Sequence, residues 1–432
     1  MKISGFRELA PSQRAFEKSA IEIIDAAFSL YGFQNIETSS AQSAKDLLAK
    51  GETSKEIYLL SRLQGVENKT AEINLESEKQ LGLRFDQTIP LANYIYEFSN
   101  DIVFPFRAYQ IGKVWRGERA QAGRFREFTQ ADIDIISSSQ LSITDEAESI
   151  ILIARVFNSL EELGCPKALI KINSRKIIES FCKYLGISKI DEVLQIIDKL
   201  KKIGADSVLK DLADKGYADK NAAQKLIEFT ESNLKTLEND KEFLNFADEN
   251  VKNEIEKLKG IISLAADSGF KNISVDFSIA RGLDYYTGLV FETFLNGFED
   301  LGSVCSGGRY DNLVKKGNAI YQGIGASIGI TRLIYILLEK NLAKEKPYKA
   351  ADALIILDSE NDRDTALKIA ESFRQRGISA LVSPNAKNYG KQINFAQKQG
   401  ILFVWFLTNE VKNIITGEQK KADPETWAPD LN

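Results

Sequence analysis

The sequence predicts an α+β protein in which an antiparallel sheet, a helical segment and a small terminal α/β domain are combined. Two runs of alternating polar and apolar residues between positions 104 and 136 have the pattern of a long hairpin. Residues 175–265 are rich in Lys, Glu, Asp and Leu at helical spacing. From Ala350 onward, apolar strand-like runs alternate with helical segments, which is typical of a small α/β domain.

The other elements follow from the same patterns, taken in chain order. Residues 11–31 carry apolar residues at helical spacing and end at Gly32, so they predict a helix. The following segment FQNIET predicts a strand, and the polar turn GERAQAGR joins the two runs of the hairpin. Strand-like, glycine-rich sequence returns from Ile273 to Gly329. The charged linker EKNLAKEKPYK then precedes the terminal strands ALIIL, SALVS and ILFVWFL.

Composition excludes several kinds of chemistry. The 432 residues include no histidine, which removes Ser/His/Asp triads, Cys/His nucleophile pairs, imidazole-bound zinc and histidine proton shuttles. The 56 basic and 61 acidic residues give a formal charge of -5, so no global field attracts nucleic acid or a membrane. Any anion site must therefore be local.

The sequence predicts neither a membrane-spanning segment nor a disulfide. Its longest apolar run, 401–407, is too short to span a bilayer, and the N-terminal residues MKISGFREL lack the apolar stretch of a signal peptide. The three cysteines, Cys165, Cys182 and Cys305, form no disulfide or metal-binding pattern. We therefore expect a cytoplasmic protein that does not contact membranes and binds no structural metal.

The second run of the hairpin places chemically active side chains on one face, because strand residues of one parity share a face. That face would carry Arg124, Arg126, Phe128, Gln130, Asp132 and Asp134, and the opposite, core face Phe125, Thr129, Ala131, Ile133 and Ile135. An extended strand from Arg126 to Asp134 covers roughly 26 Å. This length accommodates a nucleoside triphosphate at the guanidinium end and a small cationic group at the carboxylate end.

A solvent-exposed ladder of Arg and Glu is the alternative interpretation of this hairpin. Two features oppose it. The aromatic Phe128 interrupts the polar face, and the first run concentrates Arg107, Lys113 and Arg116 where only Glu118 opposes them.

The hairpin segment FRAYQIGKVWRGERAQAGRFREFTQADIDI resembles motif 2 of class II aminoacyl-tRNA synthetases, and in detail that of the histidyl-tRNA synthetase family. LRFDQTIPLANYI resembles the segment through which that family recognises its amino acid. ARGLDYYTGLVFE and SVCSGGRYDNLV resemble its two histidine signatures, and GIGASIGITRLI resembles class II motif 3. The resemblance begins at Phe6 and covers nearly the whole chain. It implies a class II core with a mixed, largely antiparallel sheet flanked by helices.

The resemblance implies roles for individual residues in ATP binding. Arg116 would contact the α-phosphate and the substrate carboxylate, and Arg281 would also lie at the α-phosphate; these two are the expected catalytic residues. Glu118 would lie near the adenine, Phe128 and Arg332 would stack on its two faces, and Arg124, with Arg126, would hold the outer phosphates. Mg²⁺ would arrive with ATP.

The same resemblance implies a histidine-binding set of seven residues. Asp86, Thr88 and Gln130 would receive the α-ammonium group, while the imidazole would be read by Asp134, Tyr285, Tyr286 and Tyr310. Tyr285 and Tyr286 have opposite parity along a strand, so only one of them can face the site.

The resemblance and the composition shifts together give five segments. They are a first part of the catalytic core at 1–173, a helical insertion at 174–268, a second part of the core at 269–340, a linker at 341–349, and an anticodon-binding α/β domain at 350–432. Residues 372–409 contain no acidic residue but carry Arg374, Arg376, Lys387, Lys391 and Lys398. These five basic residues are the expected contacts to tRNA, although a solvated helix surface gives the same pattern.

Two positions depart from the family's pattern. Ser39 stands where motif 1 usually has a proline, near the expected homodimer contact, and Thr331 stands where many relatives have an acidic residue. The glycine-rich GIGASIG is not expected to bind a dinucleotide, because Ile328 takes the third glycine position and no βαβ unit surrounds it.

The leading functional hypothesis is a ligase that uses ATP to activate histidine and transfers it to its tRNA. Activation needs aligned substrates and cations but no general base, since the attacking carboxylate is already ionised. One alternative is the non-catalytic, synthetase-like subunit of ATP phosphoribosyltransferase, against which the intact RGLDYYTG and the terminal domain argue. Another is the synthetase-like module of a stress kinase, for which the chain has no kinase segment.

Overall fold

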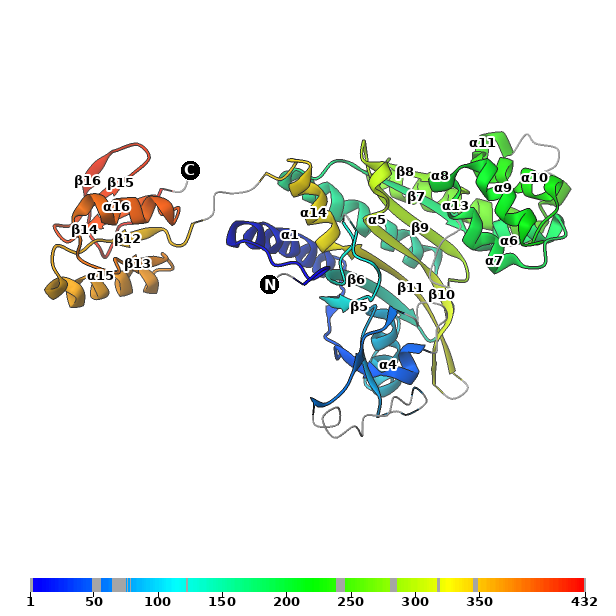
Figure 1. Cartoon of the computed structure of the whole chain (residues 1–432), viewed down its shortest axis with the longest axis horizontal. Helices are drawn as coiled ribbons and strands as arrows, with labels where there is room; N and C mark the ends of the chain where they lie inside the picture. The colour runs from blue at the N-terminus through cyan, green and yellow to red at the C-terminus, as the bar shows by residue number, and fades with distance from the viewer. Residues whose placement is uncertain are drawn as a thin grey trace. The chain divides into compact units, whose positions relative to one another are not determined.

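A computed structural model of the chain describes residues 3–48, 56–63, 75, 77, 79–121, 123–237, 245–279, 286–316, 319–344 and 349–430. The chain forms two compact units. One contains Met1–Glu8 and Glu17–Lys344, and the other contains Leu9–Phe16 and Glu345–Asn432. Figure 1 labels their helices and strands.

The first unit is built on an eight-stranded sheet with strand order β1-β5-β6-β11-β10-β9-β7-β8. All neighbouring strands in it are antiparallel except the pairs β1–β5 and β7–β8 at the two edges. The predicted mixed, largely antiparallel sheet is therefore confirmed. Its strands are β1 (Gln34–Asn35), β5 (Phe106–Trp115), β6 (Glu127–Ser137), β7 (Ala168–Ser174), β8 (Ile273–Val275), β9 (Leu289–Leu295), β10 (Cys305–Lys316) and β11 (Ala319–Gly329).

The predicted hairpin is present as β5 and β6, but two strand predictions need correction. Only Gln34–Asn35 of the expected strand FQNIET pairs in the sheet. The strand β6 begins at Glu127, so Arg124 and Arg126 precede it, although the backbone N–H of Arg116 still donates a 2.8 Å hydrogen bond to the carbonyl of Arg126. Its residues from Thr129 onward are buried on both faces, because strands flank β6 and helices pack against the sheet.

Helices pack against this sheet. The long helix α5 (Ile143–Leu160) contacts β11 and β7, and α13 (Glu249–Asp267) packs on α5 and β7. Ser142 and Asp145 form a reciprocal capping box that starts α5. The helices α4 (Thr88–Phe98) and α14 (Ile330–Glu339) contact β10 and β6 respectively. The predicted N-terminal helix is α1 (Pro11–Leu30).

The predicted helical insertion lies between β7 and β8 in the chain and gathers near the β8 edge of the sheet (Figure 1). An aromatic cluster stabilises it, with the rings of Phe181 and Phe229 stacked at a centroid distance of 4.4 Å and Phe246 packed on both. Besides α13, its helices are α6 (Arg175–Tyr184), α7 (Ile190–Ile197), α8 (Leu200–Ile203), α9 (Ala205–Asp214), α10 (Lys220–Glu231) and α11 (Leu234–Leu237).

A small antiparallel sheet stands before α4 in the chain. Its strand order is β2-β4-β3, and α2 packs against it through the buried Leu47. These elements are β2 (Ala41–Ser43), α2 (Ala44–Leu48), β3 (Leu59–Leu60) and β4 (Leu81–Leu83). The first unit also contains the short 3₁₀ turns η2 (Glu161–Leu163) and η3 (Glu299–Leu301).

The C-terminal unit is the predicted α/β domain. Its sheet has the order β13-β12-β14-β15-β16, with parallel pairing around β12 and antiparallel pairing from β14 onward. The elements are β12 (Ala353–Ile355), η4 (Glu360–Asp362), α15 (Arg363–Gln375), β13 (Ala380–Val382), α16 (Tyr389–Lys398), β14 (Phe403–Phe406), β15 (Glu410–Asn413) and β16 (Gln419–Lys421). The last two strands were not predicted.

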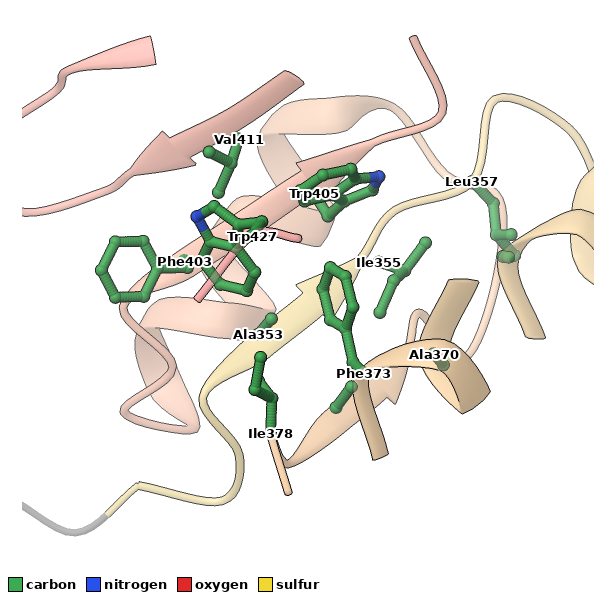
Figure 2. Packing of buried hydrophobic residues seen from close by; sticks show 12 residues of the cluster. Ala353, Ile355, Leu357, Ala370, Phe373, Ile378, Phe403, Trp405, Val411 and Trp427 are labelled. Atoms are coloured by element: carbon green, nitrogen blue, oxygen red, sulfur yellow. The ribbon is translucent and has the colours of Figure 1, made fainter. Parts of the chain in front are cut away.

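Two apolar clusters place α15 and α16 on opposite faces of this sheet. One cluster joins Phe373 of α15 to Ile355, Trp405 and Trp427, as Figure 2 shows. The other joins Ala396 of α16 to Leu354, Ile356 and Val404, the strand residues of opposite parity. No helix in the described part of the chain is long and apolar enough to cross a membrane.

Candidate functional site

The candidate site occupies one face of β6, β11 and β10. Paired residues of antiparallel strands point to the same face. The register pairs Asp132 with Ser327 and Asp134 with Gly325, and Gly325 also pairs with Gly308 of β10. The floor beside the two carboxylates is therefore made of small residues.

Larger side chains lie over the glycines of this floor. A Cβ atom on Gly323 or Gly325 would overlap the side chain above it, and one on Gly308 would lie 2.9 Å from Cδ1 of a tyrosine ring. Only glycine leaves the necessary space at these positions. The covering side chains are Tyr310 over Gly323, Asp134 over Gly325, and Tyr286 over Gly308.

Three of the predicted imidazole-reading residues thus meet at one place. The Tyr310 hydroxyl donates a 2.6 Å hydrogen bond to Asp134 Oδ1, and both side chains are buried. Burial raises the pKa of Asp134 well above its usual range, against the effect of this hydrogen bond. Burial and then the charge of Asp134 raise the pKa of Tyr286 as well, so its hydroxyl stays protonated. Tyr286, Tyr310 and Asp134 together place two phenol hydroxyls and one carboxyl group in a low-dielectric setting.

Asp132 belongs to the same face, although no role was assigned to it from sequence. Its Oδ1 accepts a 2.6 Å hydrogen bond from Ser327 Oγ, and only 4% of the residue is exposed. Burial raises its pKa to about 7, and the nearby Asp86 acts in the same direction. The alternation of β6 was the sequence signal for this residue.

This pKa predicts a pH-dependent stability. A carboxyl group whose folded pKa is raised stabilises the fold fully below its unfolded pKa near 4, and that stability is lost as the pH rises through about 7. The loss by pH 8 would be at most about 4 kcal/mol. The chain has no histidine to add a titration in this range.

We therefore expect the calorimetric melting temperature of the unliganded protein to fall between pH 5 and pH 8, and Asp132→Asn to flatten that dependence. Asp214→Asn, at an exposed position on α9, serves as the control and should retain the slope. An unchanged slope in Asp132→Asn would contradict the assignment.

The predicted ammonium-binding residues lie beside Asp132, at the start of α4. Asp86 Oδ1 accepts a 3.1 Å hydrogen bond from the backbone N–H of Ile89, and Gln87 Nε2 donates to the carbonyl of Gln130 at 3.2 Å. The side-chain oxygens of Gln87 and Gln130 are buried and have no hydrogen-bond partner among the described residues. Buried acceptors of this kind can receive the N–H groups of a ligand. Thr88, the first residue of α4, is half-buried next to them.

Arg84 is a second residue that the sequence interpretation missed. It is buried, and its guanidinium donates to the carbonyls of Lys113 and Thr38, each at 2.8 Å. A Cβ on Gly112 would lie 2.5 Å from its Nη2. Desolvation lowers the pKa of Arg84, while the charge of Asp132 opposes that effect. The buried positive charge of Arg84 therefore offsets negative charge on Asp132 and Asp86.

The guanidinium end of the site contains Arg116 and Phe128. The Arg116 guanidinium carbon lies 5.2 Å from the centroid of the Phe128 ring, and its Nε donates a 3.0 Å hydrogen bond to the carbonyl of Phe85. Phe128 and Asp134 are six residues apart on β6, about 20 Å along an extended strand. The two ends are thus held on one rigid element.

The remaining arginines of this end are held by the polypeptide itself. Arg124 pairs with Glu118 at 3.4 Å on the surface, and Arg126 Nε donates to the carbonyl of Glu118 at 3.1 Å. Arg332 donates to the carbonyl of Leu301. The structure therefore brings Arg116 to Phe128 but directs Arg332 to the turn at Leu301.

Thr331, one of the two departures from the family's pattern, has a structural contact. Its hydroxyl accepts a 2.8 Å hydrogen bond from the backbone N–H of Thr129, so it ties α14 to β6. The GIGASIG segment lies inside β11, an antiparallel strand, which excludes a dinucleotide-binding turn there. Two predicted site residues, Arg281 and Tyr285, lie outside the described residues.

The five basic residues of the C-terminal unit separate into two groups. Arg374 donates to the carbonyl of Ala380 at 2.9 Å, and Arg376 donates to those of Trp427 and Pro424 at 2.6 and 2.5 Å, so both stabilise the α15 side. The other three line a cavity of about 300 Å³ along α16, together with Asn394 and Phe395; they are Lys387, Lys391 and Lys398.

Comparison with known proteins assigns the fold and the site to a family. Residues 5–333 match the histidyl-tRNA synthetase family. The chain belongs to the histidyl-tRNA synthetase family. A histidine–tRNA ligase of Bifidobacterium longum is 44% identical over 453 residues, covering 99% of this chain and 97% of the relative.

Solved structures of histidyl-tRNA synthetases share the fold. The crystal structure of the enzyme from a Nostoc species superimposes with a TM-score of 0.82 at 33% identity and covers 97% of this chain and 96% of its own. An ATP phosphoribosyltransferase regulatory subunit/histidyl-tRNA synthetase from Bacillus halodurans C gives a TM-score of 0.71 at 18% identity, covering 91% of this chain and 96% of its own. The second likeness concerns the fold alone. The predicted class II architecture is thereby confirmed.

Proposed function

We propose that this chain is a histidine–tRNA ligase, which converts histidine and ATP to histidyl-adenylate and pyrophosphate and then transfers histidine to the 3′ end of its tRNA. The observation that carries the proposal is the buried hydrogen bond from Tyr310 to Asp134, with Tyr286 beside it, on the same face that holds Arg116 and Phe128. Membership of the histidyl-tRNA synthetase family supports the same activity.

The carboxylate end suits histidine. A phenol hydroxyl and a buried carboxyl group can each contact one imidazole nitrogen, and an apolar amino acid could make neither contact. The α-ammonium group would lie against Asp86, Thr88 and Gln130. We add Asp132 to this set because its side chain is buried on the same face, two residues before Asp134 on β6.

The guanidinium end suits ATP. Arg116 would oppose charge on the α-phosphate, Phe128 would carry the adenine ring, and Arg332 would close over that ring after leaving Leu301. Glu118 would lie near the adenine, and Arg124 would hold the outer phosphates after leaving its exposed ion pair with Glu118. Arg281 remains the second expected α-phosphate contact, on sequence grounds alone.

The reaction requires alignment and charge rather than proton transfer. The substrate carboxylate attacks the α-phosphorus, the new C–O–P bond forms, and pyrophosphate leaves with the electrons of the broken P–O bond. Guanidinium groups fixed on a rigid sheet stabilise the developing negative charge. ATP would enter as its Mg²⁺ complex. Within the described residues, no group of three or more Asp, Glu or Cys side chains is arranged to hold a metal ion.

The five segments predicted from sequence fit this function. The core at 1–173 and 269–340 would carry out activation, the insertion at 174–268 would contact the acceptor arm of tRNA, and the linker at 341–349 would connect them to the anticodon-binding domain at 350–432. A homodimer and a cytoplasmic location, where tRNA is charged, complete the proposal.

The α16 cavity is the better tRNA contact within the C-terminal unit. It combines Lys387, Lys391 and Lys398 with Phe395, a ring on which an unstacked base can lie. Arg374 and Arg376 are already bonded to backbone carbonyls on the α15 side. We therefore assign the RNA contact to the three lysines and treat the two arginines as structural.

Charge reversal should separate the two sides of this unit. We expect the double variant Lys391→Glu with Lys398→Glu to raise the KM for tRNA about tenfold or more. The slope of the logarithm of the binding constant against the logarithm of the salt concentration should become shallower by about two, one for each lost lysine. Lys368→Glu, at an exposed position on α15, is the matched control and should change the KM little. If Lys368→Glu raised the KM for tRNA more than the double variant does, the tRNA would instead contact the α15 side.

Histidine-dependent exchange of labelled pyrophosphate into ATP tests the proposed activity. The purified chain should support exchange with histidine and not with other amino acids. Absence of exchange would favour the regulatory-subunit alternative, since the shared fold does not distinguish a ligase from that protein.

A further inference from the structure

A second polar cluster lies behind the strand that carries Tyr310. Side chains alternate along β10, so Arg309 and Asp311 point to the face opposite Tyr310. Arg309 Nη1 lies 2.6 Å from Glu146 of α5, and Arg309 Nε lies 2.9 Å from Asp311. Lys257 of α13 lies 2.7 Å from the same Glu146 carboxylate. We call Glu146, Lys257, Arg309 and Asp311 the rear network.

The rear network is balanced in charge, and its central pair, Glu146 and Arg309, is buried. The Glu146 side chain is fully buried, and that of Arg309 is only 10% exposed. Burial lowers the pKa of Arg309, but the hydrogen bonds and charges of Glu146 and then Asp311 raise it overall. Glu146 Oε1 accepts hydrogen bonds from both Arg309 Nη1 and Lys257 Nζ. Removing Glu146 would leave the charge of Arg309 without its most deeply buried partner.

The rear network also holds the segment next to Tyr286. Thr287 follows Tyr286 directly, and its backbone N–H donates a 2.8 Å hydrogen bond to the carbonyl of Arg309. Its hydroxyl donates a 2.7 Å hydrogen bond to Asp311 Oδ2. The backbones on which both tyrosines stand are therefore attached to Arg309 and Asp311.

The arginine is further fixed by β11. Its Nη2 donates a 2.7 Å hydrogen bond to Gln322 Oε1, which also accepts from the backbone N–H of Leu141. Gly288 leaves room for the arginine, since a Cβ there would lie 3.2 Å from Arg309 Cδ. Each of the three guanidinium nitrogens thus donates to one acceptor, and Glu146 supplies the most deeply buried acceptor.

We propose that Glu146 is a positioning residue for histidine binding, which acts through Arg309 and Asp311 to fix the backbone that presents Tyr286 and Tyr310. Glu146 lies on the opposite face of the sheet from the site and contacts no substrate. Because Lys257 belongs to α13, the same network links the histidine site to the helical insertion. This inference rests on the proposed function, which assigns the two tyrosines to the imidazole.

Glu146→Gln tests the inference against a matched variant on the same helix. Glu148→Gln also removes a charged partner of an arginine, since Glu148 lies 2.5 Å from Arg107, but that pair is outside the rear network. The dissociation constants of histidine and of ATP are measured separately by titration calorimetry on the full chain. Small displacements of the residues that hold binding side chains in place cause large losses of affinity. We expect about a tenfold weaker histidine complex for Glu146→Gln, with less than about a twofold change for ATP.

Equal weakening of histidine and ATP, or no change in histidine binding, would overturn the positioning role. Should Glu146→Gln fail to fold, Asp311→Asn removes the link to Thr287 at a side chain that is 24% exposed, and it should weaken histidine selectively. A wild-type chain that binds histidine but makes no adenylate would refute only the proposed function. A wild-type chain that does not bind histidine would refute both.

Discussion

Replacing Arg116 by alanine is expected to lower the rate of histidine-dependent pyrophosphate exchange by about 10³-fold. Arg116 lies 5.2 Å from the centroid of the Phe128 ring, at the guanidinium end of the face that β6 provides. A preorganised cation acts mainly on the charge that develops in the transition state, so the turnover number should fall far more than the affinity for ATP. The rate and the ATP dissociation constant are measured on the same preparation.

Arg155→Ala is the control for this experiment. Arg155 also lies near an aromatic ring, 5.8 Å from the centroid of Tyr31, but it is an exposed residue of α5. Its replacement should leave exchange nearly unchanged. An Arg116→Ala protein that retains most of its activity would show that the phosphate is bound elsewhere.

Replacing Asp134 by alanine is expected to reduce kcat/KM for histidine by about 10² to 10³-fold, because one partner of a buried hydrogen-bonded polar pair is removed. The Tyr310 hydroxyl would lose its acceptor, and the imidazole would lose its carboxylate. Asp134→Asn keeps the shape and should fall between the alanine variant and the wild type. ATP binding should not change, since Phe128 lies six residues away on the strand.

The effect must be specific to histidine to support the assignment. Steady-state exchange at varied histidine and varied ATP separates the two substrates. Asp214→Ala, an exposed carboxylate on α9, should behave as wild type. An Asp134→Ala protein with an unaltered KM for histidine would remove Asp134 from the imidazole site.

Much of this site could be predicted because strand alternation is a local property. The parity of β6 predicted that Phe128, Gln130 and Asp134 share a face, and the register confirms it. The same parity does not extend to Arg124, because β6 begins at Glu127 and Arg124 belongs to a turn with its own bridge to Gln121. Local periodicity does not indicate where a strand begins to pair.

Other parts of the site depend on contacts between distant segments and could not be predicted from local pattern. The Arg84 side chain lies against Gly112, where a Cβ atom would overlap its guanidinium group. The two residues become neighbours only when β5 packs against the segment that follows β4. Glu146 and Arg309 are separated by 163 residues. The split of the basic residues between α15 and α16 required the two faces of the C-terminal sheet to be known.

The absence of histidine also acquires a physical consequence. With no imidazole in the chain, titration near neutral pH reports perturbed groups such as Asp132 or the bound substrate itself. Imidazole enters this site only as a ligand. A histidine–tRNA ligase of this composition can therefore be titrated without background from imidazole side chains of its own.

Charging of tRNA by the purified chain tests the central claim most directly. With ATP, Mg²⁺ and total tRNA, each of the twenty amino acids is supplied in turn, and the label that is recovered on tRNA in an alkali-sensitive ester is measured. The proposed function predicts esterified histidine and none of the other amino acids, with loss of charging in Arg116→Ala. A chain that attaches no histidine to tRNA, or that attaches a different amino acid, would contradict the assignment.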